Sequence, residues 1–82
     1  MIKYYKHAED QIKERKVSKK EVEMTIKNPV EVVNGRRNRK IAHKVFNGKL
    51  LRVVYEEEED EIIVVSAYRA EPKRYLGREK WR

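Results

Sequence analysis

The spacing of hydrophobic residues changes near Pro29, from a helical pattern before it to an alternating pattern after it. Residues 7–16 are rich in good helix formers, and Ala8 and Ile12 fall on one side of the helix that they predict. This apolar stripe is thin. The helix must therefore pack against the rest of the protein to be stable.

A second helix is predicted to begin at Ser18. Ser18 and Glu21 have the spacing of a capping box, in which the serine hydroxyl accepts the amide hydrogen of Glu21 and the carboxylate accepts that of Ser18. Val22 and Ile26 then lie one turn apart on one face. The helix is expected to end at Asn28, because the proline after it disfavours helical backbone at the preceding residue.

Alternation with a period of two follows, and turn residues divide it into strands. Asn34-Gly35 predicts a tight turn, Asn47-Gly48 predicts a two-residue hairpin loop, and an acidic loop is expected at 57–60. The strands are predicted at residues 30–33, 39–46, 49–56 and 61–68. Successive hairpins after two N-terminal helices predict an α+β fold, with both helices on one face of an antiparallel sheet of three to four strands.

The predicted hairpin at Asn47-Gly48 fixes which residues face each other. Phe46 pairs with Lys49, and His43 pairs with Arg52. One face then carries Ile41, His43, Val45, Leu50, Arg52, Val54, Ile63, Val65 and Ala67. The other carries Lys40, Ala42, Lys44, Phe46, Leu51, Val53, Tyr55, Ile62, Val64, Ser66 and Tyr68. The first face is the more apolar and is predicted to receive the helices, which leaves the second as a working surface.

Composition and length narrow the class of protein. The chain has 82 residues, which suits one domain over 1–82, with 70–82 as a basic C-terminal tail. The absence of cysteine excludes disulfides and thiolate metal sites. No apolar run approaches the roughly 20 residues that span a bilayer. Residues 1–6 also lack the apolar core of a signal peptide, so a cytoplasmic protein is expected.

The net charge of +7 is unevenly spread. Residues 56–61 hold six of the 14 acidic residues, which leaves 21 positive against eight negative residues elsewhere. This excess favours a nucleic acid or an acidic protein as a partner. The candidate RNA-binding residues are Arg36, Arg37, Arg39, Lys40 and Lys44, together with Lys73 in the tail. The alternative is an ordinary solubilising surface.

The residue types present limit the chemistry. The chain has no Gly-rich phosphate loop, no histidine pair at metal-binding spacing, and no nucleophile motif around its two serines, Ser18 and Ser66. Neither a metal nor a cofactor is expected. Histidine, arginine, lysine and tyrosine are nevertheless sufficient for cleaving RNA, because the 2′-hydroxyl is the nucleophile. The protein must only move protons and neutralise a pentavalent phosphate.

Four positions are singled out for this chemistry. His7 opens the first helix and carries an imidazole suited to proton transfer near neutrality, although an exposed histidine without a function would look the same. His43 lies on the predicted core face, where a packed, hydrogen-bonded histidine is commoner than a catalytic one. Tyr68 and Arg69 end the last strand, from which Arg69 could reach across the sheet.

A set of short motifs resembles a known family. The motifs are His7-Ala8, Arg15, Val17-Ser18 with Glu21-Val22, Asn28-Pro29, Arg52-Val53-Val54-Tyr55, Ile63-Val64 and Tyr68. In order and spacing they resemble the domain of unknown function 4258 family, which is similar to RelE-like and BrnT-like toxins.

This resemblance implies two helices on a curved antiparallel sheet, and a toxin that cleaves mRNA, often on the ribosome, until an antitoxin protein silences it. It also implies His7, Arg15, Arg52 and Tyr68 as catalytic candidates, and Arg69 is added because it ends the last predicted strand. Two alternatives stay open. One is a nucleic-acid-binding module without catalysis, and the other is an interaction domain for an acidic protein.

Overall fold

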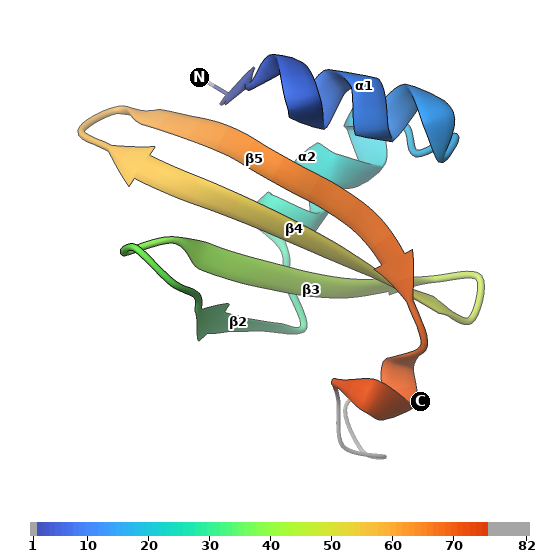
Figure 1. The fold of residues 1–82 in the computed structure, drawn as a ribbon. Helices are drawn as coiled ribbons and strands as arrows, with labels where there is room; N and C mark the ends of the chain where they lie inside the picture. Colours follow the sequence, from blue (N-terminus) through green and yellow to red (C-terminus); the bar gives the residue numbers. More distant parts are fainter. Residues whose placement is uncertain (1, 76–82) are drawn as a thin grey trace.

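The computed structural model describes residues 2–75. They form a five-stranded sheet with two helices on one face (Figure 1). The helices are α1 (Lys6–Glu14) and α2 (Lys19–Lys27), and a short 3-10 helix, η1 (Pro72–Arg74), follows the sheet. The strands are β1 (Ile2–Tyr4), β2 (Glu31–Asn34), β3 (Lys40–Phe46), β4 (Lys49–Glu58) and β5 (Glu61–Ala70), in the order β1-β5-β4-β3-β2. The predicted α+β class is confirmed.

The prediction of three to four strands, all antiparallel, was wrong. Strands β2 to β5 form the predicted antiparallel meander, but β1 precedes the helices and pairs parallel to β5. Its three residues are too short to show an alternating pattern, which is why the sequence did not indicate it. Residues 76–82 of the predicted tail lie outside the described residues.

Local signals set the helix and hairpin boundaries. Ser18 and Glu21 form both hydrogen bonds of the capping box, and Asn28 ends α2 as predicted. The β3–β4 hairpin has the predicted register, with Phe46 opposite Lys49. The prediction of a tight turn at Asn34-Gly35 was wrong. Asn34 still pairs with Lys40, and the loop between β2 and β3 runs over 35–39.

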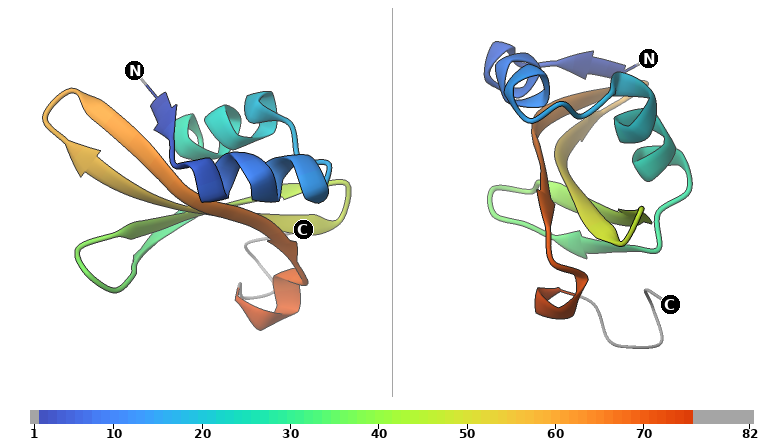
Figure 2. Two further views of the ribbon diagram at one scale, coloured as in Figure 1. Left: turned by 45° about the horizontal axis from the view of Figure 1, so that its top comes forward. Right: turned by 90° about the vertical axis from the view of Figure 1, so that its right-hand side faces the viewer.

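The helices pack on the face of the sheet that was predicted to be the working surface. Ala42, Leu51 and Val53 are buried together with Ala8 and Val22 of the helices. Figure 2 shows both helices on one side of the curved sheet, with η1 away from them. The predicted choice of face was therefore wrong, because both faces carry many apolar residues and their number did not distinguish them. The face opposite the helices is called the open face below.

A β-bulge in β5 changes which residues of the strand point toward the core. Tyr55 pairs with Val64, but its neighbour Val54 pairs with Ser66, so Val65 is an extra residue in β5. Val64 and Ala67 consequently both face the core, three positions apart. The loop between β4 and β5 also has two residues instead of the predicted four, since Glu58 pairs with Glu61.

Gln11 of α1 holds the bulged part of β5. Its Oε1 accepts hydrogen bonds from the backbone amide of Ala67 at 2.9 Å and from the hydroxyl of Ser66 at 2.8 Å. Strand β1 pairs only with Ile62, Ile63 and Val64, so the glutamine side chain supplies a partner where β1 has ended.

Each α-helix has nine residues. Within residues 2–75, no helix has the length and apolar character needed to cross a membrane.

Candidate active site

Four polar side chains form a row across the open face, one from each of four adjacent strands. Glu31 of β2 lies opposite His43 of β3, His43 lies opposite Arg52 of β4, and Arg52 lies opposite Tyr68 of β5. Directly opposite residues share a face of the sheet. These four residues, called the polar row below, therefore point away from the helices.

Arg52 is at the centre of the polar row and lies against aromatic rings. Its guanidinium carbon is 3.8 Å from the ring centroid of Tyr75, which follows η1, and 5.4 Å from that of Tyr68. Its Nε is buried and has no hydrogen-bond partner. Among the ion pairs of residues 2–75, none joins a carboxylate to Arg52. A half-buried cation of this kind retains its capacity to bind an anion.

His43 is held by Glu31 and covered by Tyr75. Only 2% of its side chain is exposed, and its Nδ1 lies 2.9 Å from Oε2 of Glu31. The ring centroids of His43 and Tyr75 are 5.9 Å apart. The second ring nitrogen, Nε2, is buried and has no partner, at a cost of about 1–3 kcal/mol. A buried nitrogen left unpaired in this way needs an explanation, and a chemical role is one.

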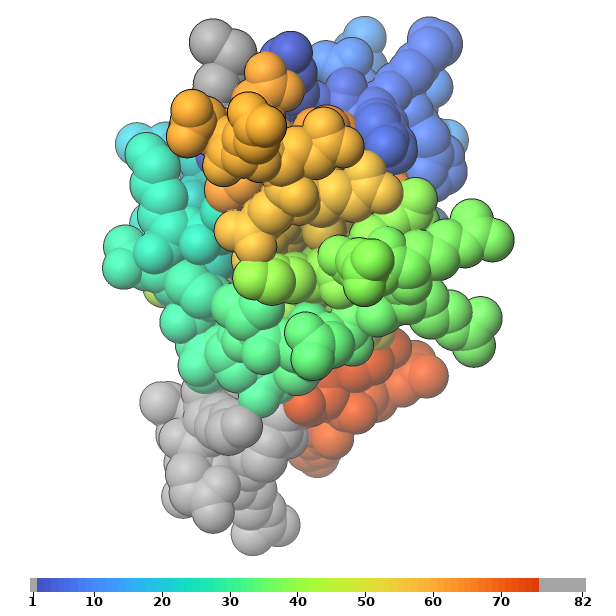
Figure 3. All heavy atoms as spheres, turned by 90° about the vertical axis from the view of Figure 1, so that its left-hand side faces the viewer, coloured from blue at the N-terminus to red at the C-terminus, as the bar shows by residue number. Residues whose placement is uncertain are grey.

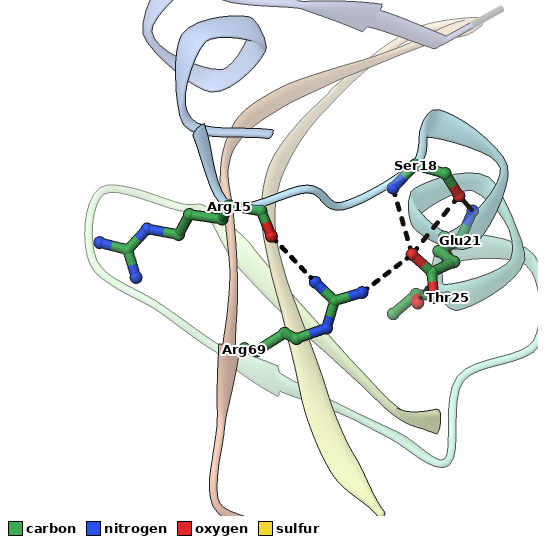
Figure 4. A network of polar contacts seen from close by, with 5 residues as sticks. All are labelled: Arg15, Ser18, Glu21, Thr25 and Arg69. Atoms are coloured by element: carbon green, nitrogen blue, oxygen red, sulfur yellow. Dashed lines mark hydrogen bonds and ion pairs between the residues drawn. The ribbon is translucent and has the colours of Figure 1, made fainter. Parts of the chain in front are cut away.

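Arg69, one of the predicted catalytic residues, joins β5 to the junction between the helices (Figure 4). Its Nη1 donates to the backbone oxygen of Arg15 at 3.3 Å, and its Nη2 lies 3.2 Å from Oε1 of Glu21. The same carboxylate accepts the backbone amide of Ser18. In Figure 4 the guanidinium of Arg15 points away from this network. The structure therefore brings Arg15 and Arg69 together through a backbone atom, on the helix side of the sheet.

His7 lies apart from the polar row. It is an exposed residue in the first turn of α1, which packs against the face opposite Arg52. Of the predicted catalytic residues, only Arg52 and Tyr68 are neighbours on the open face.

The predicted RNA-binding segment meets the acidic hairpin. Arg39 pairs with Glu56 at 2.9 Å and Lys40 pairs with Glu57, so the two charged segments lie side by side, as Figure 3 shows for the β2–β3 turn and the β4–β5 hairpin. Hydrogen bonds from the Tyr5 hydroxyl and from Arg39 lower the pKa of the Glu56 carboxyl.

The hydrogen bond to Glu57 raises the pKa of Lys40. Lys44 donates to the carbonyl of Asn28 at the end of α2. Arg36 and Arg37 are exposed in the turn, and Lys73 is exposed in η1, two residues before Tyr75. The acidic run thus neutralises part of the basic segment.

Sequence reasoning did not single out Glu31, and it set His43 aside because the wrong face was assigned to the core. The hairpin register did pair His43 with Arg52, and this pairing was the available signal. Within the described part of the chain, no cluster of three or more His, Cys, Asp or Glu side chains is arranged to hold a metal ion.

Comparison with known proteins gives one match. No curated protein and no solved structure matches the chain. Residues 4–69, which include the whole polar row, match a family described as a domain of unknown function. The chain therefore belongs to the family Domain of unknown function (DUF4258).

Proposed function

We propose that the protein is an endoribonuclease that cleaves mRNA without a metal ion, as the toxin of a toxin–antitoxin pair. The observation that carries the proposal is Arg52, a half-buried guanidinium on the open face that lies against two tyrosine rings. A cation in such a position could stabilise the negative charge of a scissile phosphate, because electrostatic attraction is stronger where water is partly excluded. The sequence motifs, which we expect to resemble those of RelE-like toxins, favour the same function.

The residues beside Arg52 are suited to the remaining tasks. Tyrosine rings stack on unpaired bases, and such bases are the usual targets of sequence-specific RNA recognition. Lys73 and Arg74 lie in η1 immediately before Tyr75 and offer two further cations for the RNA backbone. Tyr68, directly opposite Arg52, is the neighbouring hydroxyl that would protonate the leaving oxygen.

The test compares the wild type with Arg52→Ala on a labelled single-stranded RNA in excess EDTA, and on mRNA in a translating extract. The wild type should give fragments with 2′,3′-cyclic phosphate and 5′-hydroxyl ends. Arg52→Ala should lower the cleavage rate by about 10²–10³-fold, the usual loss when one charge-stabilising donor is removed. Lys20→Ala is the matched control, since Lys20 is an exposed cation on α2.

A non-catalytic RNA-binding module is the second candidate, because the same rings and cations could hold RNA without cleaving it. Intact RNA in both assays, with folded wild-type protein that binds RNA and releases it in salt, would reject the nuclease and favour this module. Binding that is equally weak for RNA and DNA would instead favour an acidic protein partner.

A further inference from the structure

We propose that His43 is the general base of this site and that Glu31 is the positioning residue that keeps its Nε2 free to accept a proton. This inference rests on the proposed endoribonuclease function and assigns a residue to its first proton transfer. It reverses the sequence-based view of His43 as a packed structural residue.

The hydrogen bond to Glu31 decides which nitrogen can act as a base. A carboxylate only accepts hydrogen bonds, so the imidazole must donate to it from Nδ1. In the neutral ring the proton then resides on Nδ1, and Nε2 carries the lone pair. The second nitrogen of the ring points away from the group bound to the first. Nε2 therefore lies on the side of the ring remote from Glu31, buried and without a partner.

The order of residues in the polar row matches the geometry of RNA cleavage. In that reaction the attacking 2′-oxygen and the leaving 5′-oxygen lie on opposite sides of the phosphorus, so base and acid must flank the phosphate. His43 and Tyr68 occupy the two neighbours of Arg52 in the row. Adjacent strands are about 4.8 Å apart, which places the two backbones about 10 Å from each other and leaves room for a phosphate held by Arg52.

The proton and bond changes balance without a further reagent. Nε2 of His43 accepts the proton of the 2′-hydroxyl as the 2′-oxygen bonds to phosphorus. The bond from phosphorus to the 5′-oxygen breaks, and the hydroxyl of Tyr68 gives its proton to that oxygen. The products are a 2′,3′-cyclic phosphate and a 5′-hydroxyl. Exchange with water then removes the proton from His43 and returns one to Tyr68.

Access to His43 requires movement of Tyr75. Among residues 2–75, the titratable and charged groups facing His43 are Glu31 from β2, Arg52 from β4 and Tyr75 after η1. Tyr75 covers both His43 and Arg52, so RNA must displace its ring or stack on it in a new position.

The experiment measures single-turnover cleavage of labelled RNA, as a function of pH, by the wild type, His43→Asn, Glu31→Gln and Arg52→Ala. Asparagine places an amide where Nδ1 stood, and so keeps a donor for Glu31 while removing Nε2. His43→Asn should lose about 10²–10⁴-fold in rate, with unchanged RNA affinity and melting temperature. It should also lose the acidic limb of the pH–rate profile.

Glu31→Gln tests the positioning role, because its amide can donate to Nδ1 and shift the ring proton to Nε2. We expect at least a tenfold loss of rate, by analogy with serine proteases, where such a swap traps the wrong tautomer. Long-range proton–nitrogen NMR spectra of histidine-labelled protein should show the Nδ1–H tautomer for His43 in the wild type, and its loss in Glu31→Gln.

The outcomes separate the two proposals. Cleavage at the wild-type rate by His43→Asn, with Arg52→Ala impaired, overturns the role of His43 and leaves the proposed function standing. No cleavage by the wild type overturns both. If His43→Asn does not fold, the tautomer decides, since an Nε2–H ring in the wild type overturns the inference.

Discussion

One side chain, Gln11, accepts two hydrogen bonds from the bulged part of β5, and its replacement gives a quantitative test of how the bulge is held. Gln11→Met keeps the length of the side chain and removes the acceptor for the amide of Ala67 and the hydroxyl of Ser66. Ala67 is fully buried, so its amide would lose its partner away from water. The hydroxyl can rotate toward another acceptor, and its loss should count for less.

An unsatisfied buried donor costs about 1–3 kcal/mol, and we expect Gln11→Met to lower the free energy of unfolding by about 2 kcal/mol. In a domain of this size that corresponds to a fall in Tm of roughly 8–16 °C. Urea denaturation gives the free energy, and hydrogen exchange of the Ala67 amide reports the bond directly. Gln11→Glu retains an acceptor oxygen and is the matched control, expected to stay closer to the wild type.

Equal stability of Gln11→Met and the wild type, with the Ala67 amide still protected, would refute this reasoning. The bulge would then be held by β-strand pairing alone.

Further predictions concern the Glu56 carboxyl, the shielding of His43 by Tyr75, and the effect of the Glu31–His43 pair on stability. The pKa of the Glu56 carboxyl is held below its ordinary 4.5 in the folded state, so its contribution to stability is present above about pH 4.5 and lost as the pH falls below it. Glu56→Gln should therefore be less sensitive to acid in a series of urea denaturations. Tyr75→Ala should expose His43 to diethyl pyrocarbonate, which peptide mapping would detect; equal labelling in both proteins would contradict the covering role of Tyr75.

The double variant Glu31→Leu, His43→Leu should be as stable as the wild type or up to about 4 kcal/mol more stable, whereas Glu31→Leu alone should be destabilised. Thermal denaturation of the two variants measures the difference. A destabilised double variant would mean that the pair is kept for stability.

The sequence contained the local features of this fold. Ser18 and Glu21 set the start of α2 because capping depends on residues three apart. Asn47-Gly48 set the register of β3 and β4 because both residues accept the positive φ values, 51° and 79°, that the turn requires. This register is what placed His43 beside Arg52, so half of the polar row was predictable from one dipeptide.

The remaining features depend on contacts between distant parts of the chain. The choice of sheet face and the bulge both involve α1, whose thin apolar stripe gave no indication of where it would pack. Tyr75 reaches the row because η1, which follows β5, lies on the side of the sheet away from the helices (Figure 2). No pattern within one element could reveal these contacts.

The bulge links the packing of the protein to its candidate active site. Ala8 of α1 and Ala67 of β5 are both fully buried, and small side chains at both positions allow the helix to approach the strand closely. If β5 alternated regularly through Val65, without the bulge, Ser66 and Tyr68 would share the face of Val64 and Tyr68 would point toward α1. A tyrosine there would separate the helix from the sheet and leave Arg52 with only one of its two aromatic neighbours, Tyr75. By leaving Val65 unpaired, the bulge therefore places the small side chain in the core and the aromatic one in the polar row.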